Sequence, residues 1–345
     1  MSCTLLIPHL WWPRDAGKEA YRDLAVPVLG TCLARATRRI FPAIGWEAWL
    51  CQAFEVERQH DWPIAPVALT LDGGDPGNAY WLRADPVHLR AHRDQLLLAD
   101  SSAFNLSECE SHSLIQALNG HFQAEGLHFT APCPERWYLR LDTDPQIATA
   151  MLDDVAGMPV DAHLPSGTRA LHWHGFMNEV QMLLHDDPVN EAREARGELP
   201  VNGVWLWGGG RRPAVPGRHF QAVTANDALT LALAANADIP ATPLADDADA
   251  WLRQLGMDKE ASQLIVLNQL TAPAHRGDLG AWREAVVALE RRWIAPLAAA
   301  LKQGRLGELV LVAPGNRGCA RFELTRPRLF QFWRSRRPLA SYLPA

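Results

Sequence analysis

Three short apolar runs, separated by helical patterns, place the strongest constraint on the fold of this chain. They cover residues 4–8, 264–268 and 309–312. Each run is too short for a core helix and has no alternating polar side, which is typical of a strand covered on both faces. Residues 279–302 repeat apolar side chains at helical spacing. Strands that alternate with helices in this way predict a doubly wound, mostly parallel sheet.

A second kind of pattern lies in the first half of the chain. Residues 80–85 and 136–141 alternate polar with apolar side chains, which predicts strands with one solvated face. Between them, Ser107 stands three residues before Glu110, the spacing of a capping box at the start of a helix. This strand–helix–strand segment predicts a smaller inserted α+β subdomain at 76–165.

The predicted organisation is therefore one α/β core that is interrupted once. The core is expected at 1–75 and 166–345, on either side of the inserted subdomain. The remaining core elements predicted from the pattern are a strand at 66–71 and helices at 18–40, 170–196, 225–235 and 246–255.

The apolar and aromatic run at 204–207, in the stretch 201–213, is followed by three glycines and two arginines. Three residues without Cβ let the backbone turn sharply and present its N–H groups, and guanidinium groups suit phosphate or carboxylate. The pattern predicts a strand end with an anion pocket, although a tight turn with two solvated arginines fits equally well. The spacing is not that of a P-loop or a dinucleotide fingerprint. The five residues are Gly208, Gly209, Gly210, Arg211 and Arg212.

Composition narrows the expected partners and location. The formal net charge of −6 offers no general attraction for nucleic acid or an anionic membrane, so neither is an expected partner. The six cysteines form no C-x-x-C pair, and this excludes the usual zinc spacings and is typical of reduced thiols. No apolar run approaches the roughly 18 residues of a membrane helix, and no signal-peptide pattern opens the sequence. A cytoplasmic location is expected.

The C-terminal segment 326–337 is a local exception to the acidic composition. It is rich in arginine, but Phe330, Phe332 and Trp333 interrupt it. Aromatic side chains at this density predict a packed terminal segment rather than a free basic arm.

One block of the sequence resembles a known family. Asp187, Pro188, Asn190 and Arg193, with the block 202–210, are similar to the matching block of cofactor-independent phosphoglycerate mutases of the archaeal type. Those enzymes belong to the alkaline phosphatase-like superfamily of metalloenzymes. The resemblance implies an alkaline phosphatase-like fold, and it implies that Asn190 and Arg193 help to hold a phosphorylated substrate. More narrowly, the chain resembles the bacterial group of RpfE-type regulatory proteins.

The resemblance extends along the chain but breaks at the metal positions. The family holds two divalent metals at strand ends. Here His9 follows the first strand in place of an aspartate, Thr271 replaces the aspartate four residues before His275, and Gly315 and Asn316 replace the final Asp-His pair. Two neighbouring divalent cations need several carboxylates to offset their charge. No metal and no other cofactor is therefore expected.

The expected function follows from these departures. The positions nearest to the family's serine or threonine nucleophile are Ala65 and Pro66, which have no hydroxyl. The chain is expected to be a catalytically degenerate, non-enzymatic relative that binds or regulates, with a residual phosphate pocket for a phosphorylated small molecule or with a protein partner. Two alternatives stay open. One is an active phosphoglycerate mutase or phosphotransferase whose metal ligands are replaced by Asp72, Asp75 or Asp278. The other is a structural interaction protein, as the 14 tryptophans and the C-terminal segment suggest.

Overall fold

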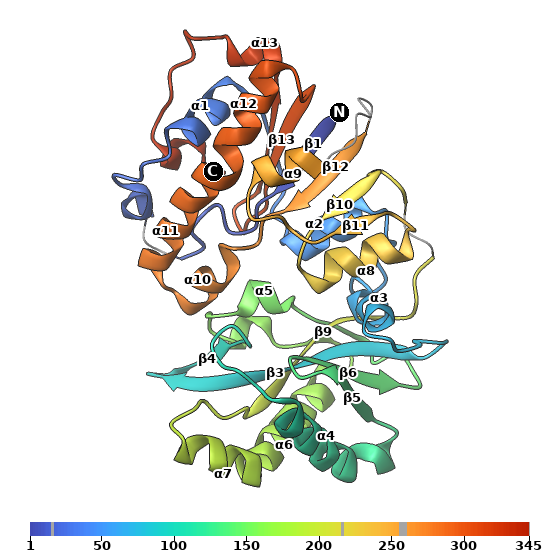
Figure 1. Ribbon diagram of the computed structural model, residues 1–345. Helices are drawn as coiled ribbons and strands as arrows, with labels where there is room; N and C mark the ends of the chain where they lie inside the picture. The colour runs from blue at the N-terminus through green and yellow to red at the C-terminus, as the bar shows by residue number, and fades with distance from the viewer. Residues whose placement is uncertain (15–16, 215–216, 255–260, 345) are drawn as a thin grey trace. The chain divides into compact units, whose positions relative to one another are not determined.

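The computed structural model describes residues 1–14, 17–214, 217–254 and 261–344. The chain forms two compact units (Figure 1). Unit 1 consists of Met1–Phe54 and Gly217–Ala345, and unit 2 consists of Glu55–Pro216. Among the described residues, none of the helices combines the length and the apolar composition needed to span a bilayer.

Unit 1 is built on a seven-stranded sheet. In spatial order its first five strands are parallel to one another, and the sixth strand pairs antiparallel with both the fifth and the seventh. The apolar runs predicted as strands form β1, β12 and β13, side by side at its centre. This confirms the predicted mostly parallel sheet. In spatial order the strands are β11 (Ala241–Thr242), β10 (Ala222–Thr224), β12 (Ser262–Val266), β1 (Ser2–Leu6), β13 (Glu308–Ala313), β14 (Cys319–Thr325) and β2 (Thr37–Phe41).

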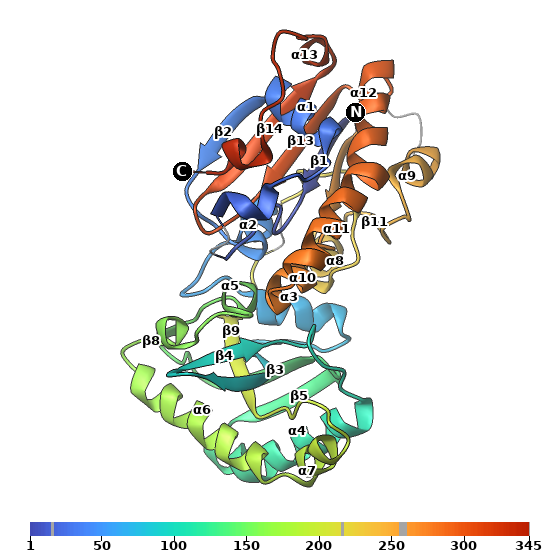
Figure 2. The same cartoon turned by 90° about the vertical axis from the view of Figure 1, so that its left-hand side faces the viewer.

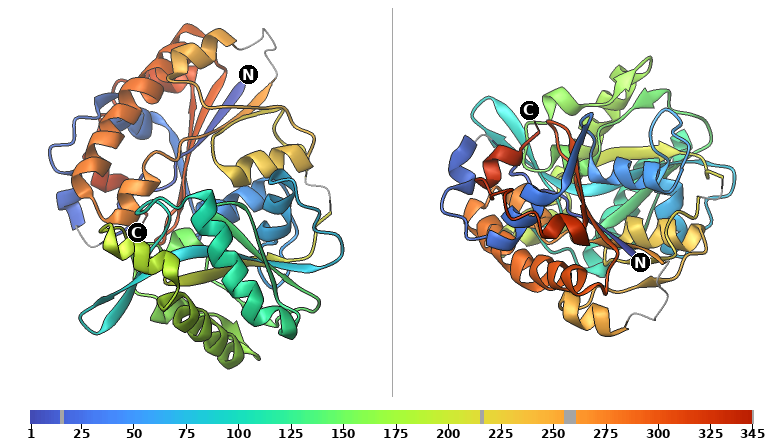
Figure 3. Two further views of the ribbon diagram at one scale, coloured as in Figure 1. Left: turned by 60° about the horizontal axis from the view of Figure 1, so that its bottom comes forward. Right: turned by 90° about the horizontal axis from the view of Figure 1, so that it is seen from above.

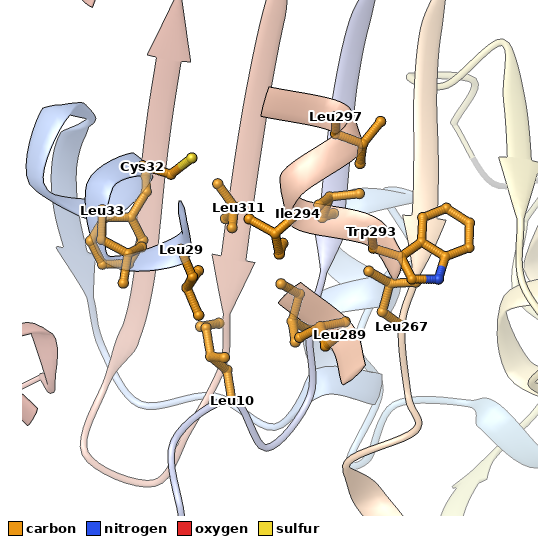
Figure 4. Packing of buried hydrophobic residues seen from close by; sticks show 14 of the residues in the cluster. Leu10, Leu29, Cys32, Leu33, Leu267, Leu289, Trp293, Ile294, Leu297 and Leu311 are labelled. Atoms are coloured by element: carbon orange, nitrogen blue, oxygen red, sulfur yellow. The ribbon is translucent and has the colours of Figure 1, made fainter. Parts of the chain in front are cut away.

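Helices cover both faces of this sheet. Leu311 packs on one face with Leu29 and Ile294, in the cluster drawn in Figure 4. The left view of Figure 3 shows the orange helices α11 and α12 on that side and the yellow helix α8 on the other. The helices of unit 1 are η1 (Gly17–Tyr21), α1 (Pro27–Arg35), α2 (Trp46–Ala53), α8 (Ala228–Asn236), α9 (Ala248–Gln254), α10 (Thr271–Arg276), α11 (Leu279–Leu289), η4 (Glu290–Ile294), α12 (Ala295–Gln303), α13 (Arg326–Leu329) and η5 (Leu339–Tyr342).

The long helical segment predicted at 279–302 is continuous but contains a π-turn, η4. The turn carries the buried Glu290, whose carboxylate accepts hydrogen bonds from the backbone N–H groups of Val28 (3.2 Å) and Leu29 (2.9 Å). These are the first N–H groups of α1, and Val26 at its N-cap makes no side-chain cap. A carboxylate from another helix therefore supplies the missing cap.

Unit 2 is an antiparallel sheet in which β3 pairs with β4, β6 and β9. Figure 1 shows α4, α6 and α7 on one face of this sheet and α3 on the other. The first face is packed with aromatic side chains, among them Trp137, Phe129 and Phe176. The strands are β3 (Tyr80–His92), β4 (Gln95–Ala99), β5 (His128–Cys133), β6 (Arg136–Leu141), β7 (Ile147–Ala148), β8 (Ser166–Gly167) and β9 (Gly203–Gly210). The helices are α3 (Ile64–Leu71), α4 (Glu108–Phe122), η2 (Gln123–Glu125), α5 (Leu152–Val155), η3 (Asp161–His163), α6 (Ala170–His185) and α7 (Pro188–Ala195).

The capping box predicted before α4 is present. Ser107 Oγ accepts a hydrogen bond from the backbone N–H of Glu110 (3.3 Å), and the Glu110 carboxylate accepts one from the backbone N–H of Ser107 (3.0 Å). This reciprocal pair satisfies two of the N–H groups that a helix start leaves without a partner.

Two predicted elements are different in the structure. Residues 66–71 were predicted as a strand, but they belong to helix α3, whose buried Ala65, Ala68 and Leu69 share one face. A short apolar run cannot be assigned to strand or helix by periodicity alone. The helix predicted at 18–40 ends at Arg35, and the β-branched and aromatic residues that follow form the edge strand β2.

The unit boundaries also differ from the predicted insert at 76–165. Unit 2 begins at Glu55 and ends at Pro216. The physical reason is the pairing of β9 with β3, which ties the glycine-rich strand to the antiparallel sheet rather than to the parallel one. The helices α6 and α7 also belong to unit 2, because they pack against the sheet face formed by β9 and β3.

The three glycines do not end β9 but form its last residues, all of them buried. An added Cβ at Gly209 would lie 2.6 Å from Leu82 Cδ2 and 2.9 Å from Tyr80 Oη. At Gly210 it would lie 2.6 Å from Pro63 Cβ, and at Gly208 it would lie 3.0 Å from Ile64 Cβ. The glycines therefore let β9 lie close to the start of α3 and to β3.

We expect Gly209→Ala to destabilise the protein by about 1–3 kcal/mol, because the new methyl group overlaps Leu82 and Tyr80. Urea unfolding followed by circular dichroism would measure the change. The matched control is Gly120→Ala inside α4, where nothing lies within 4 Å of the added Cβ. That change should stabilise by about 0.5–1 kcal/mol. Equal effects at both positions would contradict the proposed role of Gly209.

Candidate functional site

The carboxyl ends of three parallel strands lie side by side in unit 1. Leu6, the last residue of β1, is opposite Val266 of β12 and Val312 of β13. The residues that follow these strands therefore meet at one edge of the sheet, which is where open α/β sheets bind ligands. The positions predicted to have held metal in the family all follow these strands: His9, Thr271, His275, Gly315 and Asn316.

Two imidazoles lie together at this edge. The rings of His9 and His275 meet edge to face, with their centroids 5.3 Å apart. His9 has a φ of 54°, a left-handed conformation that histidine, asparagine and aspartate tolerate better than most residues. Its carbonyl accepts a hydrogen bond from Trp282 Nε1 (2.8 Å), which fixes the backbone in this conformation. His275 is buried on the short helix α10.

Thr271 stands one helical turn before His275 on α10. Its Oγ1 is buried and has no hydrogen-bond partner within the described part of the chain. A buried hydroxyl without a partner is costly, and a bound ligand could satisfy it. Asn316, after β13, is exposed.

A guanidinium adds positive charge beside the imidazoles. Arg14 Nη2 donates a hydrogen bond to the carbonyl of His275 (2.6 Å), and burial lowers the pKa of Arg14. Gly277 has a φ of +69°, and a Cβ there would lie 2.5 Å from Arg14 Nη1. The glycine therefore leaves room for the guanidinium. Sequence reasoning missed Arg14, because only the fold brings it next to a residue so distant in the chain.

This set of donors does not fit a pair of divalent metal ions. The positions where the family's pattern requires an aspartate hold His9, Thr271 and Gly315, and none of them is a carboxylate. Magnesium- and manganese-type cations prefer oxygen ligands, and two of them close together need several negative charges. The edge instead carries the positive charge of Arg14 beside the two imidazoles.

The position predicted to match the family's nucleophile lies in the first turn of α3. Ala65 and Pro66 are both buried there and have no hydroxyl. The hydroxyl that α3 does contain belongs to Thr70 in the last turn, and it donates a hydrogen bond to the carbonyl of Val67 (2.7 Å). No residue of the first turn of α3 can therefore serve as an oxygen nucleophile.

Asn190, predicted to belong to the anion pocket, is buried and hydrogen-bonded to the backbone. It is 2% exposed, and its Nδ2 donates to the carbonyls of Leu184 (2.7 Å) and Val201 (2.8 Å). Its Oδ1 accepts the backbone N–H of Val201 (2.8 Å). These bonds join the end of α6 to the chain that enters β9.

Arg193 is held in the same way. It is 1% exposed, and its Nε donates to the carbonyl of Leu199 (2.8 Å). Its Nη1 lies 3.1 Å from the Glu110 carboxylate, and its guanidinium carbon lies 5.9 Å from the centre of the Phe104 ring. Arg193 thereby connects α7 to the start of α4.

The structure does not bring these two residues to the glycine run. Asn190 contacts Val201, and a strand rises by about 3.3 Å per residue, so Gly209 lies roughly 25 Å farther along. Gly209 donates its backbone N–H to the buried Asp61, and Gly210 pairs with Trp81 in the sheet. Donors that already face a carboxylate or a strand are poorly placed to receive an anion.

Arg211 and Arg212 are exposed. The backbone N–H of Arg211 donates to Gln59 Oε1 (3.0 Å), and its guanidinium donates to the carbonyl of Asn78. The predicted pocket therefore falls into two separate groups. Asn190 and Arg193 lie together on α7, and the glycines and these two arginines are neighbours because they are adjacent in the chain.

The carboxylates proposed as replacement metal ligands each have another role. Asp72 accepts two hydrogen bonds from Arg136 (2.6 and 2.9 Å) and one from Tyr138 (2.6 Å). Burial alone would raise the pKa of Asp72, but these bonds hold it below its usual value. Asp75 accepts the backbone N–H of Gly77, and Asp278 caps α11.

Sequence patterns also missed a buried ion pair in unit 2. Arg83 and Asp85 were predicted on the solvated face of a strand, yet they are only 6% and 3% exposed. Arg83 Nη2 lies 2.6 Å from Asp85, and its guanidinium lies between the rings of Tyr138 and Trp207. The predicted alternation of the two strand faces was correct, but α3 packs on part of the face predicted to be solvated. The sequence of the strand does not show whether that face is covered by a helix or by water.

Glu110 gives a test of the structural role of Arg193. Burial alone would raise the pKa of Glu110, but hydrogen bonds from Ser107 and the charges of Arg193 and Arg196 lower it to about 2. A lowered pKa stabilises the fold above the unfolded value near 4.5, and this stability is lost as the pH falls toward 2. We expect Glu110→Gln to cost about 2 kcal/mol at pH 7 and to flatten the loss of stability on acidification.

Urea unfolding between pH 7 and pH 3 would measure this prediction. Glutamine retains the capping box, so only the charge is removed. The control is Glu108→Gln, an exposed residue in the same helical turn. Parallel pH profiles for the wild type and Glu110→Gln would show that the ion pairs with Arg193 and Arg196 contribute nothing measurable.

Unit 1 contains a seven-stranded sheet with candidate ligands after its parallel strands, and the antiparallel α+β unit 2 lies between the two segments of unit 1 in the sequence. This arrangement is the alkaline phosphatase-like fold of the cofactor-independent phosphoglycerate mutases. Two solved structures share it. The cofactor-independent phosphoglycerate mutase from Thermoplasma acidophilum aligns with 100% of this chain and 95% of its own, at a TM-score of 0.51 and 14% identity. A protein from Pyrococcus horikoshii aligns with 94% of this chain and 87% of its own, at a TM-score of 0.54 and 14% identity. These comparisons confirm the predicted fold class.

Curated relatives carry the same name. A probable 2,3-bisphosphoglycerate-independent phosphoglycerate mutase from Geobacter sulfurreducens is 27% identical over 159 residues, 46% of this chain and 39% of the relative. The 2,3-bisphosphoglycerate-independent phosphoglycerate mutase from Methanothrix thermoacetophila is 30% identical over 177 residues, 47% of this chain and 45% of the relative. The chain thus matches less than half the length of these relatives, and no protein-family model matches it.

Proposed function

We propose that this chain is a catalytically degenerate phosphoglycerate mutase-like protein with a binding or regulatory role, in keeping with its resemblance to the RpfE-type regulatory proteins. One observation carries the proposal. The positions after β1, β12 and β13 where the fold family places acidic metal ligands hold His9, Thr271 and Gly315. The loss of carboxylates at three strand ends removes the charge that two divalent cations require.

The nucleophile position supports the same conclusion independently. Ala65 and Pro66 cannot attack phosphate, and Thr70 donates its hydroxyl hydrogen to its own helix. A chain that keeps the fold while lacking both halves of the chemistry fits a role in binding better than a role in turnover.

We place the residual anion site at the carboxyl edge of the unit 1 sheet rather than at the glycine run. This edge offers the guanidinium of Arg14, the imidazoles of His9 and His275, and the buried hydroxyl of Thr271. Basic groups and an unsatisfied hydroxyl suit a phosphorylated small molecule. The positive charge that metals supply in the family would here come from side chains.

Metal content is the first test of the proposal. Protein purified without chelator, incubated with manganese and zinc and then desalted, should retain no pair of metal ions, and it should not interconvert 3-phosphoglycerate and 2-phosphoglycerate. Two tightly held equivalents together with turnover would favour the alternative, an active mutase with rearranged ligands. One zinc equivalent, lost in His9→Ala and His275→Ala, would show a single-metal imidazole site and contradict the metal-free part of the proposal.

Restoring the acids provides a complementary test. We expect the double variant H9D/T271D to retain more manganese than the wild type, because it returns two carboxylates to the sheet edge. Aspartate tolerates the left-handed φ of position 9, and position 271 lies one turn before His275. Mass spectrometry of bound metal would measure the gain. The control is S335D, an added carboxylate at an exposed, remote position.

Anion binding is tested by calorimetry with 3-phosphoglycerate. We expect Arg14→Gln to weaken binding by at least about tenfold, as the loss of one charge-assisted hydrogen bond implies. Arg212→Gln, at an exposed arginine of the glycine run, should bind like the wild type. The reverse result would return the anion site to the glycine run, and no binding by the wild type would remove the ligand from the proposal.

A further inference from the structure

The C-terminal segment of unit 1 exposes aromatic and basic side chains together. We call residues 326–338 the basic-aromatic segment. Phe330, Phe332 and Trp333 are 52%, 79% and 68% exposed, respectively. The prediction of a packed segment was therefore wrong for these three residues. The arginines of the segment are Arg326, Arg328, Arg334, Arg336 and Arg337.

The exposure is not the result of a loose chain end, because the segment is fixed on both sides. At its first turn, α13, the carbonyl of Leu329 accepts a hydrogen bond from Arg35. After it, Leu339 and Tyr342 are buried, and Arg38 Nη2 donates to the carbonyl of Tyr342 (3.1 Å). An anchored loop thus holds the aromatic side chains outward, and their apolar surface is exposed to water.

The segment lies at the opposite edge of the sheet from His9 and His275. The strand β14 runs antiparallel to β13 and ends at Thr325, level with Glu308 at the start of β13. Figure 2 shows α13 beyond these ends of β13 and β14. A role for the segment is therefore independent of the proposed function of the carboxyl edge.

The charge of the segment is uniform. Glu323 is the last carboxylate side chain of the sequence, so the five arginines are followed and separated by no acidic residue. Arg336 faces the buried Glu290, and Arg334 Nη1 lies 3.4 Å from the carbonyl of Ala36. The segment is a cationic patch on a chain whose net charge is −6.

We propose that the basic-aromatic segment binds the surface of an anionic lipid membrane. Phenylalanine and tryptophan rings enter the boundary between head groups and acyl chains, while neighbouring arginines bind lipid phosphates. Each basic residue near an anionic surface adds to the attraction, and an aromatic and a basic component together give firmer binding than either alone. The net charge of the whole chain does not exclude this, because the attraction acts only within about 10 Å.

The arrangement of the rings favours a lipid surface over single-stranded nucleic acid. The planes of Phe332 and Trp333 meet at 79°, with their centroids 5.3 Å apart. Consecutive bases stack on ring faces that follow the direction of the strand, and two rings at nearly a right angle do not provide that. Insertion into a lipid interface requires only that both rings project outward.

The experiment measures flotation of the full-length protein with vesicles. We expect binding to vesicles of phosphatidylcholine with about 30% phosphatidylglycerol at low salt and at least tenfold weaker binding to phosphatidylcholine alone. The variant F332S/W333S should bind the anionic vesicles at least tenfold less. The variant R334Q/R337Q should bind less at low salt and show a weaker dependence on salt.

The matched control removes equally exposed apolar side chains from unit 2. Leu171 and Met182 are 85% and 74% exposed on α6, and L171S/M182S should bind like the wild type. Because all of these positions are exposed, thermal melts should be unchanged, which separates loss of binding from loss of fold.

Three results would overturn the proposal. They are no binding of the wild type to anionic vesicles at low salt, equal binding by F332S/W333S, and equal loss in L171S/M182S. Binding of a fluorescent oligothymidine in place of the vesicles, lost in F332S/W333S, would assign the segment to nucleic acid instead.

Discussion

The pairing of β9 with β3 is the interaction on which unit 2 depends. It joins segments that are far apart in the sequence, and it fixes the register of Arg83 against Trp207 and of Trp81 against Gly210. Because β9 ends in three glycines, α3 can lie against it at backbone distance. The same close approach places Ala65 and Pro66, the predicted counterparts of the family's nucleophile, in a tightly packed helix start. Packing at this point is therefore part of the architecture, whether or not chemistry remains.

The parallel sheet of unit 1 could be predicted because its strands are buried on both faces. Residues 4–8, 264–268 and 309–312 are apolar except for Thr4 and Asn268 at the ends of two of the runs. The start of α4 could be predicted because Ser107 and Glu110 interact within one turn. The run at 66–71 could not, since a helix buried on several sides has the same composition as a buried strand.

The site could be located only in part. The rule for carboxyl ends of parallel strands led to His9 and His275, which the structure places ring to ring. Arg14 and the unsatisfied hydroxyl of Thr271 carry no local signal, since both depend on contacts made in the folded chain. Asn190 and Arg193 were assigned to a pocket by resemblance, yet their polar atoms bind carbonyls and a helix-capping carboxylate within unit 2.

The environments of Asn190 and Arg193 have a consequence for the transfer of function between relatives. The block that most resembles active phosphoglycerate mutases is, in this chain, the block that connects α6, α7, α4 and β9. Selection for a folded protein is enough to preserve such residues, whether or not the chemistry is kept. The strand ends that carry His9, Thr271 and Gly315 belong to unit 1 and take no part in these contacts. Similarity concentrated in scaffold residues thus records descent, and activity has to be judged at the strand ends.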